Sequence, residues 1–212
     1  WGNSITAIDP AHMWIQEGFA VYSEALYIEY KLGYNVMIDF LLKKREGIKN
    51  NLPIVGPVNE NYWAFGDSYN KGAWVLHTLR NMIDNDDLWF LILKNFAIDN
   101  AKGHVSTDTF LNYLIKATGK NYQLVFYQYF YDHRPPTFEY HQEGQKFYYR
   151  WSNVISGFAM PVDIDLNGVE KRLEVSEKLS SISISEHSVI HIRDWESLII
   201  TKRNTDLKKI KN

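Results

Sequence analysis

The spacing of apolar residues divides the chain into a helical part and a strand-rich part. Up to about Arg134, long apolar-rich segments are separated by Asp, Asn, Ser, Gly and Pro at places where helices typically begin and end. After the proline pair at 135–136, apolar residues alternate with period two, as in Phe147, Tyr149 and Trp151. This change predicts an α+β protein with a domain boundary at the proline pair.

The strand-rich part contains about seven possible strands before Lys202, which suits a small β-sandwich. Asn167-Gly168 separates Val162–Leu166 from Val169–Val175, and it is a strong hairpin signal because both turn positions need positive φ. The predicted organisation is a helical domain, a β-sandwich module and a basic tail, over residues 1–134, 135–205 and 206–212.

Composition narrows the possible functions. With 212 residues and 45% hydrophobic content, the chain can bury a real core. A formal net charge of −2 gives no electrostatic reason to expect a nucleic acid or an anionic membrane as partner. No apolar run reaches the roughly 18 residues that a membrane span requires, so a soluble protein is expected, either cytoplasmic or exported. Because cysteine is absent, any metal must take His, carboxylate or water ligands.

A long apolar segment near the start of the chain is predicted to be a buried helix. Asp9 and Pro10 form a good helix start, because Asp can cap free N–H groups and Pro fits the first helical position. Gly33 is a suitable stop. Between them the sequence is apolar almost all round, which is typical of a helix that is buried on most faces.

Glu17 lies in the middle of this helix and is the first candidate for chemistry. Burying an ionised carboxylate there costs several kcal/mol unless a cation, a metal or a change of protonation offsets it. For an isolated Glu, an ion pair from another helix or a solvent-filled cleft is the commoner explanation. No local residue compensates its charge, since its helical neighbours at three and four residues are Met13, Trp14, Ala20 and Val21.

The surrounding residues match a longer motif. In order, they read Trp1-Gly2-Asn3, Thr6, Trp14 and Glu17-Gly18-Phe19-Ala20-Val21-Tyr22. This pattern resembles the zinc-binding region of the aminopeptidase N type of zinc metallopeptidase, the gluzincin-type M1 family. In that family a helix with His-Glu-x-x-His runs into an aromatic-Gly-Asn segment, and the next helix supplies the third zinc ligand.

The resemblance implies that Glu17 is a zinc ligand in a His₂Glu set with an open fourth position, an arrangement typical of catalytic zinc. The family spacing puts the second of the two His ligands three positions before Trp1. The resemblance therefore implies one Zn²⁺ in a longer parent protein, and weak or absent zinc binding by these 212 residues alone. It also implies that an N-terminal part of the parent packs on the Glu17 helix.

A second segment, residues 66–76, resembles the family's Tyr-x-Lys-Gly-Ala signature followed by an apolar helix. By this resemblance Tyr69 stabilises the oxyanion that forms when water attacks the peptide carbonyl, which is typically worth a few kcal/mol. A buried Tyr bonded to a backbone carbonyl is the alternative. We expect Asp67 to cap this helix, Lys71 to reach solvent with its charged end, and Gly72 to let another element approach closely.

Glu24 lies two helical turns after Glu17 on the same face, where the family often has an acid. Two roles are open for it: holding a ligand His in the correct tautomer, or an ordinary ion pair. None of the seven histidines replaces the two family ligands, and His12 faces away from Glu17 on the predicted helix.

The predicted fold is therefore α+β and multidomain: the helical C-terminal half of a thermolysin-like catalytic domain, followed by a small β-sandwich. The predicted function is that of a zinc metallo-aminopeptidase, a hydrolase that removes N-terminal residues from peptide substrates. The chain alone is expected to be inactive, because two ligands, the general base and the family's Gly-x-Met-Glu-Asn amine-recognition segment are not in the sequence. The alternatives are a non-catalytic scaffold or interaction relative, and a hydrolase of non-peptide bonds with the same fold.

Overall fold

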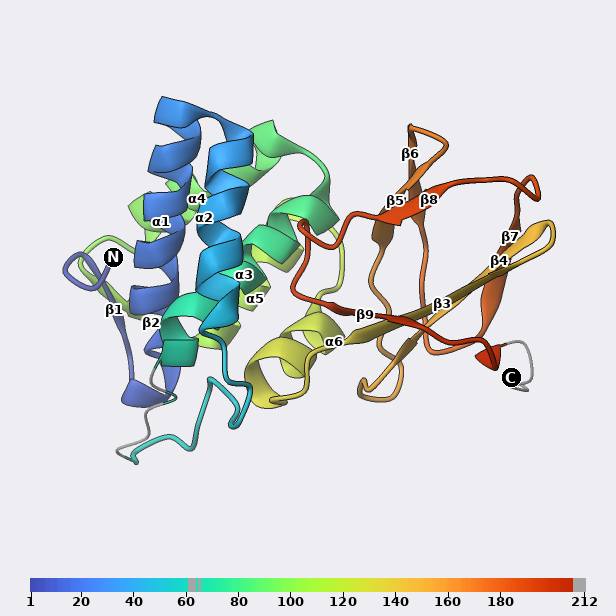
Figure 1. Cartoon of the computed structure of the whole chain (residues 1–212). Helices are drawn as coiled ribbons and strands as arrows, with labels where there is room; N and C mark the ends of the chain where they lie inside the picture. The colour runs from blue at the N-terminus through green and yellow to red at the C-terminus, as the bar shows by residue number, and fades with distance from the viewer. Residues whose placement is uncertain (61–63, 65, 208–212) are drawn as a thin grey trace. The chain divides into compact units, whose positions relative to one another are not determined.

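The computed structural model describes residues 1–60, 64 and 66–207. The chain forms two compact units, residues 1–133 and 134–212, of which the first is mainly helical and the second consists of strands (Figure 1). The predicted α+β class is confirmed. Most of the predicted basic tail, residues 208–212, lies outside the described residues.

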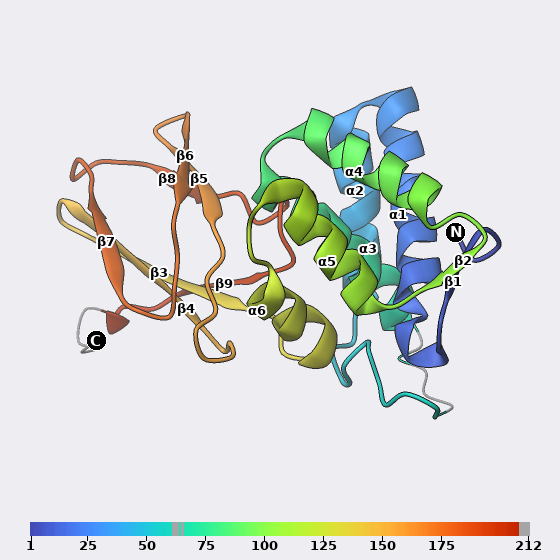
Figure 2. The same cartoon turned by 180° about the vertical axis from the view of Figure 1, so that it is seen from behind.

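The first unit is built around helix α3. Helices α1 and α2 lie in front of α3 in Figure 1, whereas α4 and α5 lie in front of it in Figure 2, seen from behind. The helices are η1 (Pro10–His12), α1 (Trp14–Leu32), α2 (Tyr34–Glu46), α3 (Gly66–Ile83), α4 (Asp86–Asp99), α5 (Thr107–Thr118), α6 (Gln123–Phe126) and the π-helical η2 (Tyr127–Tyr131). Two short strands that the apolar pattern does not predict, β1 (Ile5–Ala7) and β2 (Gly103–Val105), pair in parallel.

Helix α1 ends where the sequence predicts, but it begins at Trp14, after a separate short turn at the predicted start. The Asp9 carboxylate accepts the Ala11 N–H at 2.9 Å, and the η1 turn that Pro10 opens leads directly into α1. Gly33 ends the helix with φ of 95°, a backbone conformation that favours glycine. One face of α1 is open to solvent, which agrees with the predicted burial on most faces. The buried face is formed by Trp14, Ile15, Gly18, Phe19, Val21, Tyr22 and Ala25.

Helix α3 is the most deeply buried element, with every residue from Lys71 to Arg80 buried. The Arg80 guanidinium pairs with the Glu29 carboxylate of α1 at 2.6 Å and with the Asp86 carboxylate of α4 at 2.7 Å. Arg80 is only 4% exposed, so these bonds offset most of the penalty for burying its charge.

The second unit contains two sheets. One has the strand order β7-β4-β3-β9 and the other β6-β5-β8. Its strands are β3 (Thr137–Glu143), β4 (Lys146–Ser152), β5 (Val162–Leu166), β6 (Val169–Leu173), β7 (Ser180–Ser183), β8 (Ile190–Ile192) and β9 (Ile200–Arg203). In the turn between β5 and β6, Asn167 and Gly168 have φ of 54° and 81°, which confirms the predicted hairpin.

Within the described residues, no helix combines the length and apolar character that crossing a membrane would require.

Candidate functional site

The first residues of the chain fold back onto α1. Gly2 has φ of 89°, and its carbonyl accepts the Thr6 hydroxyl at 3.0 Å. The Trp1 ring packs on Phe19 with centroids 4.1 Å apart, and its indole N–H donates to the Ser23 hydroxyl at 3.1 Å. The aromatic-Gly-Asn segment and Thr6 therefore shape a turn and fix it to the Glu17 helix.

Glycines let α1 and α3 touch through their backbones. A Cβ atom on Gly18 would lie 2.9 Å from the Gly72 Cα and 3.2 Å from the Ser68 carbonyl oxygen. A Cβ atom on Gly72 would in turn lie 3.0 Å from the Gly18 Cα. Gly72 therefore permits the close approach that its small size predicts, and its partner is the glycine that follows Glu17.

The two helices run side by side in the same direction. Gly18 meets Gly72 near their first turns, and Glu29 pairs with Arg80 near their last turns. Their N-terminal ends, which carry partial positive charge, therefore lie together. Glu17 is the fourth residue of α1 and Tyr69 is the fourth residue of α3, so this geometry places them at the same end of the helix pair.

The Tyr69 hydroxyl lies close to the Glu17 carboxylate. Partial burial of the ring and the nearby negative charge of Glu17 raise the pKa of Tyr69. The phenol therefore keeps its proton at neutral pH and remains a hydrogen-bond donor. Two residues that are 52 positions apart in the sequence thus form one polar site.

Solvent reaches both of these side chains. Tyr69 is 38% exposed, and Glu17 is half-buried. This half-buried position agrees with the alternative that Glu17 faces a solvent-filled cleft. Glu17 is therefore accessible to a ligand, and its charge does not by itself require a cation.

Two residues near Tyr69 in α3, Asp67 and Lys71, have contacts that differ from those the sequence predicts. Helix α3 begins at Gly66, and the Asp67 carboxylate accepts the backbone N–H groups of Lys49 and Asn50, each at 2.8 Å. Asp67 therefore fastens the segment after α2 to α3, a role that the cap prediction missed.

Lys71 does not reach solvent, since it is fully buried. Its ammonium donates to the carbonyl oxygens of Asp132 and His133 at 3.5 and 3.3 Å. Burial lowers the pKa of Lys71 to about 8, against the opposing attraction of Asp67 and Asp132. Lys71 therefore joins α3 to the end of the helical unit and does not face the site.

The other candidates lie elsewhere. Glu24 is exposed on α1, and its proposed contact with a ligand His stays a prediction. His12 is buried with its Nδ1 atom 2.9 Å from the Thr107 hydroxyl, which also accepts the Trp14 indole N–H at 2.8 Å. This arrangement gives Trp14 and His12 a role in joining α1 to α5.

A metal would find one suitable ligand at this site. Across residues 1–60, 64 and 66–207, no group of three His, Cys, Asp or Glu side chains is placed to hold a metal ion. Glu17 is an accessible carboxylate and fits the role of a single ligand. The described part of the chain therefore offers one ligand of a set.

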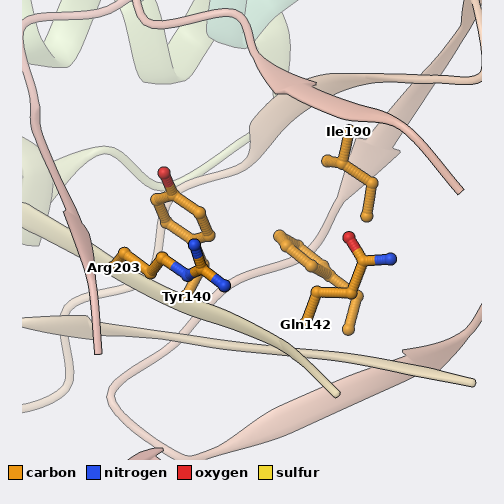
Figure 3. Close-up of a pocket in the computed structure, with 5 residues that line it drawn as sticks. Tyr140, Gln142, Ile190 and Arg203 are labelled. Carbon is orange, nitrogen blue, oxygen red and sulfur yellow. The ribbon is translucent and has the colours of Figure 1, made fainter. Parts of the chain in front are cut away.

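A pocket of about 250 Å³ lies in the second unit (Figure 3). Tyr140, Gln142, Phe147, Ile190 and Arg203 line it, from strands of both sheets. These side chains include no carboxylate or imidazole, so the pocket is unsuited to metal-dependent hydrolysis.

Comparison with known proteins identifies the family. The sequence model of the peptidase family M1 domain matches residues 1–129. Because this match covers more than half of the chain, the chain belongs to peptidase family M1. Both motif segments, around Glu17 and around Tyr69, fall within it. A search of the curated proteins gave no significant match.

The fold is also found in a solved peptidase. A crystal structure of Legionella pneumophila aminopeptidase A in complex with aspartic acid is similar, with a TM-score of 0.73 and 16% sequence identity. The similarity covers 95% of this chain and 25% of that one, so this chain spans about a quarter of the length of that enzyme. At this identity the likeness concerns the fold.

Proposed function

We propose that this chain is part of a zinc-dependent aminopeptidase, in which Glu17 is a metal ligand and Tyr69 a catalytic hydrogen-bond donor. The observation that carries the proposal is the convergence of these two side chains at the Gly18–Gly72 contact. Each motif alone is short, but together they bring a carboxylate and a phenol into one accessible site.

The metal set would be shared with residues outside this sequence. By resemblance to the M1 family, two histidines and a general base on a His-Glu-x-x-His helix join Glu17, and that helix precedes Trp1. Zinc, when bound, would supply Lewis-acid activation of a water molecule and of the scissile carbonyl. Glu17 would hold the metal through its half-buried, accessible carboxylate, on a helix that contacts α3 through Gly18.

Tyr69 would act on the substrate. Its raised pKa keeps the phenol protonated, so it can donate to the oxygen that becomes negative as the peptide carbonyl is attacked. In the present structure the phenol lies close to Glu17. Rotation of the phenol from Glu17 to the substrate would need little repacking, since the ring is 38% exposed.

Peptides with a free N-terminus are the substrates that we propose. Support comes from the family and from the aminopeptidase whose fold this chain shares. A non-catalytic scaffold would not need the accessible Glu17 carboxylate close to Tyr69, at the point where α1 and α3 are in backbone contact. A hydrolase of non-peptide bonds would use the same residues, so substrate assays decide between a peptidase and such a hydrolase.

The test is a comparison of three forms of the full-length polypeptide that carries the upstream residues. The wild type should cleave aminoacyl fluorogenic substrates, and a chelator should abolish the cleavage. Tyr69→Phe should lower kcat by about 10² to 10³, the typical effect of removing one oxyanion donor. Tyr148→Phe, in β4 of the second unit, is the matched control and should leave kcat unchanged.

Cleavage that persists in the chelator, or full kcat in Tyr69→Phe, would contradict the proposal. The isolated 212-residue chain is expected to be inactive and to bind zinc weakly if at all, because it supplies one ligand. Tight stoichiometric zinc in a metal analysis of this chain would overturn that expectation.

A further inference from the structure

Asp67 is a buried acid with no direct part in the proposed chemistry. It is 4% exposed, two residues before Tyr69, in the first turn of α3. One carboxylate oxygen accepts the Lys49 N–H and the other accepts the Asn50 N–H, both at 2.8 Å. Bonds of this kind to a charged acceptor are among the stronger hydrogen bonds in proteins. They tie the start of α3 to the segment that follows α2.

Several contacts of this turn lie after Tyr69. A Cβ atom on Gly47 would lie 2.8 Å from the Asn70 amide nitrogen, so the end of α2 touches Asn70 closely. Lys71 is bonded to the carbonyls at the end of the helical unit, and Gly72 touches Gly18. Before Tyr69, the two bonds of the Asp67 carboxylate fasten the turn to the segment after α2. The Asp67 N–H also donates to the Ala64 carbonyl at 3.1 Å, and the Ser68 carbonyl faces Gly18.

Packing sets the direction of the Tyr69 side chain only in part, because 38% of the residue is exposed. Its position depends on the backbone of the first turn of α3. First turns of helices fray readily, since their N–H groups lack partners within the helix. An anchor before Tyr69 therefore limits how far its hydroxyl can move relative to Glu17.

We propose that Asp67 is a positioning residue for Tyr69: by binding the Lys49 and Asn50 amides it holds the first turn of α3 and so fixes the Tyr69 hydroxyl beside Glu17. This inference rests on the proposed function, because it assigns Asp67 to the step in which Tyr69 donates to the substrate. Positioning matters at this scale, since a misplacement of about 1 Å can lower a rate by about 10²-fold.

The anchor itself can be tested in the 212-residue chain without any activity. Asp67→Asn keeps the shape of the side chain but leaves one acceptor oxygen for two amides. Amide hydrogen exchange measured by NMR should become about tenfold faster at Lys49, Asn50 and Tyr69, in line with the loss of one hydrogen bond to a charged group. Asp87→Asn, at an exposed acid in the first turn of α4, is the matched control and should change none of the three.

Faster exchange at Lys49 and Asn50 with no change at Tyr69 would overturn the inference, because the anchor would then not reach Tyr69. Unchanged exchange at all three amides would overturn it as well. Asp67→Ser, which is smaller and keeps one acceptor, serves as the second variant if Asp67→Asn does not fold.

The catalytic consequence is tested by a double-mutant cycle in the full-length enzyme. Asp67→Asn should lower kcat about tenfold and leave KM within about twofold, because it moves a donor that acts in the transition state. In a Tyr69→Phe background the same change should lower kcat by less than about twofold, since there is no hydroxyl left to position.

Additive effects would overturn the inference, and they would show that Asp67 acts through general stability or through the charge of Lys71. If Tyr69→Phe alone leaves kcat unchanged, the proposed role of Tyr69 fails and with it the catalytic part of the inference. The exchange measurement then still decides whether Asp67 fixes the position of Tyr69, so the two failures are distinguishable.

Discussion

Replacing Gly18 with alanine should separate the two helices that carry the site. The added Cβ atom would lie 2.9 Å from the Gly72 Cα and 3.0 Å from the Gly72 carbonyl carbon, whereas ordinary van der Waals contact begins at 3.4 Å. The shortfall is about half an ångström, and both opposing atoms are backbone, so neither can rotate away. The helices must move apart as rigid bodies.

The magnitude follows from two opposing effects. Alanine is favoured over glycine inside a helix by about 1 kcal/mol. Overpacking a core typically costs about 1 to 3 kcal/mol, and a clash between two backbones belongs at the upper end of that range. We therefore expect Gly18→Ala to lower the free energy of unfolding of the helical unit by about 2 kcal/mol.

Urea unfolding followed by tryptophan fluorescence is a suitable assay, because Trp14 and Trp74 are fully buried in this unit. Gly66→Ala is the matched control. It also lies in a helix of the pair, a Cβ atom there would meet nothing within 4 Å, and it should be neutral or stabilising. If Gly18→Ala is as stable as the wild type, the argument that glycines set the helix contact is refuted.

Two further predictions concern buried charges. Arg80→Met should lower the free energy of unfolding by about 3 kcal/mol, because it leaves the Glu29 carboxylate without its partner. Urea unfolding measures this loss, and a loss below about 1 kcal/mol would contradict the prediction. The pKa of Lys71 is about 8 in the folded chain and 10.5 ordinarily. Between pH 8 and 10 the unfolded chain therefore holds a proton that the folded chain lacks, so the contribution of Lys71 to the free energy of unfolding should increase with pH. The stability of the wild type minus that of Lys71→Met should therefore rise by roughly 1 kcal/mol per pH unit in that window, and a constant difference would refute the account.

The features that the sequence predicts well are local ones. Asp9 caps the start of the first helical segment with its side chain, and Gly33 ends that segment because glycine favours positive φ. Asn167-Gly168 forms its turn for the same backbone reason. The approach of another element to Gly72 is likewise predicted from the size of a single residue. Each of these depends on one or two residues and their immediate neighbours.

The features that it predicts poorly depend on distant partners. Lys71 can be buried because the carbonyl groups of Asp132 and His133, 61 and 62 positions away, accept hydrogen bonds from its ammonium. Nothing near Lys71 in the sequence indicates these partners. The apolar pattern around Glu17 predicts burial on most faces, but it does not show which face of α1 stays exposed, because that is set by the elements that pack against it.

Within the candidate site, the motifs predict both members but not their contact. The proximity of Tyr69 to Glu17 follows from the close contact of α1 and α3, which depends on Gly18 as well as Gly72. The anchoring role of Asp67 is missed because its partners are backbone N–H groups, which carry no sequence signal. The signal that could have indicated the contact is a pair of glycines, Gly18 directly after Glu17 and Gly72 one helical turn after Tyr69.

The most direct test of the account is the zinc content of the full-length polypeptide with and without Glu17. Wild type and the control Glu46→Gln, at an exposed acid of α2, should each bind one zinc per molecule. Glu17→Gln should bind zinc at least about 10²-fold more weakly and lose peptide cleavage, because a neutral amide replaces the charged ligand. Full zinc occupancy and full cleavage in Glu17→Gln would contradict the central claim.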